Sequence, residues 1–196
     1  PMARALQTLK AFAIPLLVGT FAVYLILVKA HAARPSDTLP RYGVIPEFRL
    51  SDHDGRPVSR ETLLGTIWIA DFIFTRCAGQ CPMMSTEMAR LATMFQRHPS
   101  VQFVSFTVDP AWDTPRVLAE YAKVYGASGD RWRFVTGDEA TLTRLCQDGF
   151  RLAVAEDGGT ASEPITHSVR LVLVDPAGNI RGYYDATDAQ QMTQLR

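Results

Sequence analysis

The stretch "TIWIADFIFTRCAGQCPMM", residues 66–84, decides the fold, because an apolar run leads through a two-cysteine loop into a helical pattern. Residues 66–74 are rich in β-forming apolar side chains and suit a buried strand. Pro82 stands where a first helical residue is expected, since its missing N–H costs nothing there. The sequence therefore predicts a strand, a loop carrying Cys77 and Cys81, and a helix, in that order.

Apolar residues recur at helical spacing after this loop. Met84, Met88, Leu91 and Phe95 follow one another at intervals of three or four residues, which places them on one face of an amphipathic helix. Met83 and Met84 lie next to the cysteines, and their spacing favours packing in the core over binding a metal.

Strands and helices alternate along the rest of the chain. We expect strands over 47–59 (two, with a turn), 101–108, 131–136, 167–175 and 179–185, and helices over 114–125, 138–149 and from Thr187 onward. This order, with its closing hairpin, predicts an α/β architecture with a mostly parallel central sheet. Function in such sheets gathers at the carboxyl ends of strands, where the cysteine loop lies.

The first part of the chain has a different character. Residues 11–28 are uncharged and apolar, and at about 1.5 Å per residue they nearly cross a bilayer core. Ala30 and Ala32 also fit a signal-cleavage site, so an uncleaved anchor is expected, with a cleaved signal as the alternative. We divide the chain into an anchor or signal (1–30), a linker (31–45) and one folded domain (46–196).

Charge excludes one broad class of function. Twenty basic and twenty acidic residues leave no net charge, so the sequence lacks the electrostatic footprint of a nucleic-acid-binding protein.

Three chemistries suit a pair of cysteines in an exported domain: a structural disulfide, a redox pair or a metal site. A disulfide between Cys77 and Cys81 would close a very short loop and stabilise little. Cys81, just before a helix, is expected to have a lowered pKa and to form a thiolate easily. A third ligand is needed to distinguish metal binding from redox chemistry.

The four histidines are the first candidates for that ligand. His31 lies in the linker, while His53 and His98 lie in a turn and near a helix end, where solvated side chains are expected. His167 stands at the start of a β-rich segment, where it is either bonded to the backbone or available as a ligand.

Three motifs together resemble one known family. "FTRCAGQCP", "FTVDPAWDTP" and "THSVRLVLVDPAGNI", in this order and spacing, are similar to the Sco/SenC family, membrane-tethered copper proteins of cytochrome oxidase assembly. The resemblance covers residues 46–185. It implies a thioredoxin-like fold with a central mixed sheet flanked by helices. It also implies one copper, as Cu(I), Cu(II) or both, held by Cys77, Cys81 and His167.

The chemistry of these side chains agrees with the resemblance. Soft thiolates suit Cu(I), and imidazole suits both oxidation states, whereas zinc normally takes a fourth ligand that the sequence does not obviously supply. The resemblance also implies an acidic residue near the metal. Asp109 and Asp113 are the candidates, either to orient His167 or to meet a partner, with turn and helix-entry roles as the alternative.

Trp112 and Cys146 lie outside the proposed ligand set, and the sequence predicts a different environment for each. Trp112 stands where the family usually has a charged residue, which suggests an exposed aromatic contact. Cys146 follows the apolar positions of a helix and is expected to be a buried, inert thiol.

The resemblance implies a copper metallochaperone for the dinuclear copper site of cytochrome c oxidase, rather than an enzyme. The alternative is a thiol-disulfide oxidoreductase acting on the cysteines of that oxidase subunit, with Cys77 attacking and Cys81 resolving. The C-x3-C spacing departs from the C-x-x-C of thioredoxin-like redox motifs, which favours copper.

The implied partners are the copper-site subunit of a terminal oxidase, a thioredoxin-like reductant, other copper chaperones and the membrane. We expect the domain in the bacterial periplasm, anchored to the inner membrane. The alternative is the mitochondrial inner membrane, with the domain facing the intermembrane space.

Overall fold

The structure is a computed structural model that describes residues 39–127, 129–152, 154–155, 166–167 and 169–196, with the backbone alone for 154–155 and 166–167. Contacts divide the chain into the units Pro1–Leu39 and Pro40–Arg196, and the second contains every element described below. The expected anchor, residues 11–28, lies outside the described residues. Among those described, no helix is long and apolar enough to cross a membrane.

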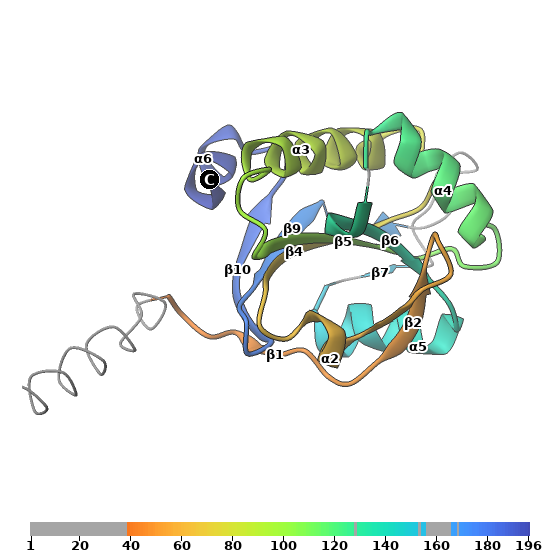
Figure 1. Ribbon diagram of the computed structural model, residues 1–196, viewed down its shortest axis with the longest axis horizontal. Coiled ribbons are helices and arrows are strands. Elements are labelled where there is room, and N and C mark those ends of the chain that lie inside the picture. Colours follow the sequence, from red (N-terminus) through yellow and green to blue (C-terminus); the bar gives the residue numbers. More distant parts are fainter. Residues whose placement is uncertain (1–38, 128, 153, 156–165, 168) are drawn as a thin grey trace, which may run out of the picture. The chain divides into compact units, whose positions relative to one another are not determined.

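One sheet of eight strands forms the centre of the Pro40–Arg196 unit, in the order β1-β10-β9-β4-β5-β6-β2-β3 (Figure 1). Its strands are β1 (Gly43–Val44), β2 (Arg49–Asp52), β3 (Pro57–Ser59), β4 (Ile67–Ile73), β5 (Val101–Thr107), β6 (Trp132–Thr136), β9 (Arg170–Val174) and β10 (Asn179–Asp185). A separate pair consists of β7 (Val154–Ala155) and β8 (Thr166–His167).

The large sheet is mixed. Strands β4, β5 and β6 are parallel, and the other neighbouring pairs are antiparallel. The expectation of a mostly parallel sheet is therefore wrong outside these three strands. The physical reason is that two hairpins, β2–β3 and β9–β10, add their strands to opposite sides of the parallel centre, and hairpin strands pair antiparallel.

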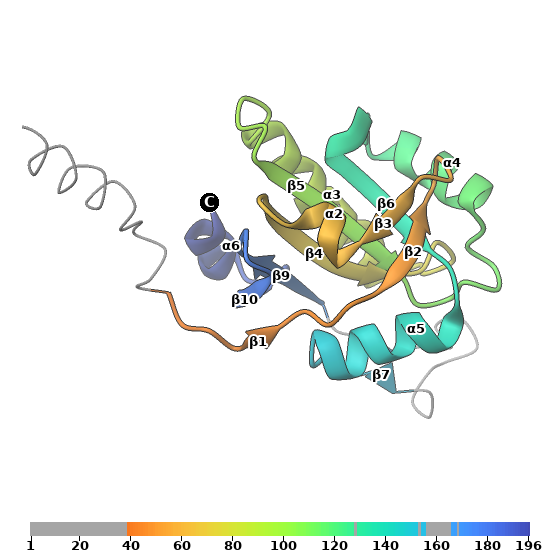
Figure 2. The same cartoon turned by 60° about the horizontal axis from the view of Figure 1, so that its bottom comes forward.

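Helices cover both faces of the sheet. Figures 1 and 2 both place α3 and α4 on one side and α5 on the other. The helical segments are α2 (Arg60–Leu63), α3 (Gln80–Met94), α4 (Pro115–Val124), a 3-10 turn (Gly129–Arg131), α5 (Glu139–Arg144), a π-helical turn (Leu145–Gly149) and α6 (Ala189–Leu195).

Strand β4 contributes side chains to both faces of the sheet. Trp68 and Phe72 pack in the apolar layer shared with α2 and α5, whereas Ile69 and Ile73 pack in the layer shared with α3, α4 and α6. A strand buried on both sides needs apolar residues at nearly every position, which explains the continuous run seen in the sequence.

Two helix starts differ from the expected ones. Helix α3 begins at Gln80 with Gly79 as its N-cap, so Pro82 is the third helical residue. The N–H of that position also lacks a partner within a helix, so proline is tolerated there. Helix α6 begins at Ala189, because the Asp188 carboxylate caps it by accepting hydrogen bonds from two backbone N–H groups.

Helix α4 begins and ends as expected. Thr114 is its N-cap and accepts a hydrogen bond from the Val117 N–H at 3.4 Å, and Pro115 is the first helical residue. Gly126 follows the helix with a φ of 69°, a left-handed conformation that glycine adopts without strain.

Candidate metal and thiol site

The cysteine loop leaves the carboxyl end of β4 and winds directly into α3. The Cys77 N–H donates to the Phe74 carbonyl at 3.2 Å, and the Cys81 N–H donates to Cys77 Sγ at 3.4 Å. Both cysteines are thiols in the structure and do not form a disulfide. Cys77 is 7% exposed and Cys81 is fully buried, so of the two cysteines only Cys77 retains any surface.

The environment of Cys81 raises its pKa, contrary to the expectation from the sequence. Burial is the largest cause, and the neighbouring Cys77 thiol and Asp71 carboxylate act in the same direction. Cys81 lies inside the first turn of α3 and packs in the apolar layer with Met84 and Met88. Loss of solvation there outweighs the helix dipole.

Asp71 is a buried acidic residue of the sheet that the sequence reasoning did not single out. It lies in the middle of β4, is fully buried, and neither carboxylate oxygen has a hydrogen-bond partner among the described residues. Burial raises its pKa to about 7, although the nearby Ser105 hydroxyl lowers it in part. The available signal was a single acidic residue within an otherwise apolar strand, which is costly without a function.

Asp113 joins the ends of two parallel strands. Its buried carboxylate accepts hydrogen bonds from the Thr75 N–H at 3.2 Å, from the Thr75 hydroxyl and from the Thr107 hydroxyl at 2.5 Å. Thr75 begins the cysteine loop and Thr107 ends β5, so Asp113 fixes the start of that loop. Burial raises its pKa, and these hydrogen bonds act in the opposite direction.

Asp109 contacts the cysteine loop from outside. Its carboxylate pairs with the Arg76 guanidinium at 2.6 Å, and the same guanidinium lies 4.7 Å from the centre of the Trp112 ring. Trp112 is 52% exposed, as expected of an aromatic surface contact. This cluster of Arg76, Asp109 and Trp112, which we call the loop latch, connects the cysteine loop to the segment before α4.

His167 lies on β8 and not on the long strand predicted from residue 167 onward. Its backbone pairs antiparallel with Val154 of β7, while β9 begins at Arg170. The position of its side chain lies outside what the structure describes. Among the described side chains, no group of three or more His, Cys, Asp or Glu residues is arranged to hold a metal ion.

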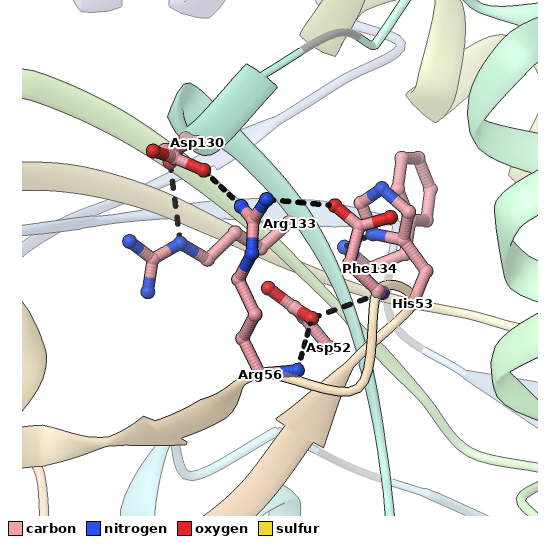
Figure 3. Close-up of polar contacts among 7 residues, drawn as sticks. Asp52, His53, Arg56, Asp130, Arg133 and Phe134 are labelled. Carbon is pink, nitrogen blue, oxygen red and sulfur yellow. Dashed lines mark hydrogen bonds and ion pairs between the residues drawn. The ribbon is translucent and has the colours of Figure 1, made fainter.

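Of the remaining histidines, His98 is exposed as expected, and His31 lies outside the described residues. His53, however, is half-buried beside Phe134 (Figure 3), and its Nδ1 accepts a hydrogen bond from the Phe134 N–H at 3.2 Å. His53 therefore accepts a hydrogen bond from a backbone N–H of β6, and the expectation of a solvated side chain is wrong for it.

Three other expectations concern side chains near the core. Met84 is fully buried, whereas Met83 is 37% exposed beside the site, so the expectation of core packing holds for the first alone. Cys146 is buried as expected, and desolvation raises its pKa to about 12, which disfavours the reactive thiolate form.

Comparisons with known proteins agree with this arrangement. The model of the SCO1/SenC family matches residues 36–195. The SCO1 protein homolog of Bacillus subtilis is 32% identical over 168 residues, which are 85% of this chain and 85% of that protein. A protein of Stutzerimonas stutzeri described as copper-binding is 35% identical over 150 residues, covering 76% of this chain and 72% of the relative.

A solved structure is similar in both fold and sequence. BsSco, a member of the Sco family of cytochrome c oxidase assembly proteins in which a disulfide switch has been identified, superimposes with a TM-score of 0.69 and 29% identity. The match covers 80% of this chain and 92% of that one. The similarity supports a thioredoxin-like α/β fold for the unit that carries the cysteine loop.

Proposed function

Because the chain belongs to the SCO1/SenC family, we propose that it binds copper and acts in the assembly of cytochrome c oxidase. The proposed ligands of one copper ion are Cys77, Cys81 and His167. The proposed recipient is the dinuclear copper site of an oxidase subunit.

The observation that carries this proposal is the arrangement of the two thiols. Cys77 lies in the loop that leads into α3 and Cys81 lies in the first turn of that helix, and the Cys81 N–H donates to Cys77 Sγ at 3.4 Å. Two soft sulfur donors four residues apart and almost out of water match the donor preference of Cu(I), which would bind them as thiolates. A copper ion bound there could pass to a partner protein when the partner's ligands replace those of this chain one after another.

His167 is proposed as the third ligand. It lies within the matched residues 36–195, and its short strand β8 fixes its backbone against β7. An imidazole would complete a three-coordinate site that binds either oxidation state and leaves a position open to a partner's ligand.

A second function is favoured by the unequal exposure of the cysteines. In thiol-disulfide exchange, the more accessible Cys77 sulfur would attack one sulfur of a partner disulfide, forming a mixed disulfide and releasing the other partner sulfur as a thiolate. Buried Cys81 would then attack Cys77, so that the partner leaves with two thiols and this chain keeps the disulfide. The disulfide switch of BsSco belongs to a relative with the same fold.

We propose that residues 11–28 anchor the chain and place the Pro40–Arg196 unit in an exported compartment, the bacterial periplasm or its mitochondrial equivalent. A thioredoxin-like reductant would be needed to keep both cysteines as thiols in such an oxidising environment. Other copper chaperones are proposed as the copper source.

Copper stoichiometry and affinity of the full chain, with its thiols reduced, test the ligand set. Wild type should bind one copper, while His167→Ala should weaken binding by more than the roughly 10–100-fold that loss of an outer-sphere partner costs. His98→Ala, which removes an exposed histidine, is the matched control and should bind like wild type. Wild-type affinity in His167→Ala would remove this histidine from the site.

A further inference from the structure

The segment that precedes α4 exposes a large aromatic side chain beside the cysteine loop. Trp112 is 52% exposed, whereas Trp68 and Trp132, the other two tryptophans of the chain, are 1% and 2% exposed. A single exposed apolar residue is common on protein surfaces and has no meaning by itself. The surroundings of Trp112 therefore decide whether its exposed ring has a role.

Backbone and side-chain contacts hold Trp112 in one position. Its N–H donates to the Asp109 carbonyl at 3.1 Å, and its carbonyl accepts from the Thr114 N–H at 2.8 Å. The Arg76 guanidinium lies 4.7 Å from the centre of the ring and is itself paired with the Asp109 carboxylate at 2.6 Å. The ring is therefore ordered before any partner arrives, which lowers the entropy cost of binding.

The same contacts place Trp112 at the edge of the cysteine loop. Arg76 is the chain neighbour of Cys77, the cysteine that retains some surface. Asp113, the chain neighbour of Trp112, accepts a hydrogen bond from the Thr75 N–H at 3.2 Å. A partner that brings its own sulfur to Cys77 therefore comes within reach of the loop latch.

The surface on both sides of the loop latch presents little charge to such a partner. Within residues 74–84, Arg76 is the one charged residue, and Asp109 neutralises its guanidinium. Within residues 110–115, the one charged residue is Asp113, which is buried. The exposed uncharged side chains of the two segments include those of Ala78, Met83, Ala111, Trp112 and Pro115. This surface fits an apolar partner surface and offers an acidic or basic one no free counter-charge.

We propose that Trp112 is the principal contact for a partner protein that exchanges copper or a disulfide with Cys77, and that the partner meets it with an apolar side chain next to its own reacting cysteine. The inference rests on the proposed function, because either exchange requires the partner's sulfur to reach Cys77. The partner's side chain packs on the open face of the indole ring, while Arg76 keeps its place against the ring. Tryptophan and arginine are the residues that most often dominate the binding energy of protein interfaces.

Three activated disulfides of thionitrobenzoate test this preference. The full chain carries Cys81→Ala and Cys146→Ala, so that Cys77 is its one thiol. In each reaction the Cys77 thiolate attacks the probe's sulfur, a new disulfide forms, and thionitrobenzoate leaves and is measured by its absorbance. Two probes are short peptides with a central cysteine, flanked by leucines in one and by aspartates in the other. The third probe, activated mercaptoethanol, measures the intrinsic reactivity of Cys77.

The ratio of the two peptide rates reports the preference, and the mercaptoethanol rate corrects for any change in access to Cys77. With Trp112 present, the leucine peptide should react about 10-fold or more faster than the aspartate peptide. Trp112→Ala should bring this ratio close to one, and Trp112→Phe should keep part of it because an aromatic face remains. Val124→Ala, which removes a 76% exposed apolar side chain at the last residue of α4, is the matched control and should keep the full ratio.

Acrylamide quenching of fluorescence shows whether the ring itself becomes covered. Because Trp68 and Trp132 are buried, the quencher reports on Trp112. Quenching should fall when the leucine peptide is joined to Cys77 and should stay unchanged when mercaptoethanol is joined there. A purely structural role of Trp112 would not produce this protection, and equal quenching of the two adducts would overturn the proposal.

Three kinetic outcomes would also overturn it, and they differ in what else they affect. Equal rates for the two peptides, with normal reaction of the mercaptoethanol probe, would remove the docking role alone. Faster reaction of the aspartate peptide, declining as salt is added, would show that Arg76 recruits an acidic partner instead. No reaction of Cys77 with any of the three probes would remove the proposed thiol exchange together with the docking role, while copper binding keeps its own test.

Discussion

Among single residues, burial decides the chemistry of this site more than position along the helix does. The sequence correctly places Cys81 at a helix start, where a dipole lowers a thiol pKa. It does not reveal that the helix begins two residues earlier than expected and that Cys81 points into the core, where desolvation raises its pKa. Burial also decides the role of Asp113. Its fully buried carboxylate accepts hydrogen bonds from Thr75 and Thr107 and therefore holds the loop in place.

The hydrogen bonds of Asp113 lead to a prediction about stability. Asp113→Ala leaves the Thr75 N–H and two hydroxyl groups without their acceptor, which should lower the free energy of unfolding by about 1–3 kcal/mol. Urea denaturation at pH 7 measures this change. Thr75→Val, which removes one hydroxyl and keeps the N–H, should cost less. Equal stability of Asp113→Ala and wild type would show that these bonds do not hold the loop.

Among the elements, the sequence predicts which segments are strands and helices better than it predicts how they meet. Apolar periodicity places β4, α3, β5 and α4 close to their observed bounds, because each buries a regular face. The loop latch could not be predicted in this way. Arg76 and Asp109 come together because β4 and β5 are parallel neighbours, so the loops that follow them begin at the same carboxyl end of the sheet.

The loop latch leads to a prediction about access to Cys77. Arg76→Ala removes the ion pair to Asp109 and the contact with the Trp112 ring, and because the pair is partly exposed it should change global stability by about 1 kcal/mol or less. If the cysteine loop loses that much stability locally, the fraction of molecules with an open loop should rise by up to about 5-fold. The rate at which iodoacetamide alkylates Cys77 should rise by the same factor.

Arg90→Ala is the matched control for this experiment, since Arg90 forms an ion pair with Glu87 within α3. It should leave the alkylation rate unchanged. An Arg76→Ala rate equal to that of wild type would show that the latch does not restrain the cysteine loop.

For the whole molecule, the sequence predicts the α/β class but not the complete sheet. Residues 43–44, within the segment expected as linker, form β1 and pair with β10. Buried Arg181 strengthens this edge by donating to the Pro40 carbonyl at 3.1 Å and pairing with Asp175 at 2.8 Å. Two-residue strands carry no periodic signal, so long-range pairing of this kind is invisible in sequence patterns.

The candidate site shows the same division between local and long-range information. Motif order is enough to propose Cys77, Cys81 and His167 as ligands, but the electrostatic effect of buried Asp71 on Cys81 depends on how α3 lies on β4. A carboxylate inside an apolar strand is the one local feature that points to it.

X-ray absorption spectroscopy of the full chain loaded with one equivalent of Cu(I) tests the central claim most directly. The account predicts two sulfur ligands and one nitrogen ligand in wild type, with the nitrogen lost and both sulfurs kept in His167→Ala. A wild-type spectrum without two sulfur ligands, or a His167→Ala spectrum identical to that of wild type, would contradict the proposed site.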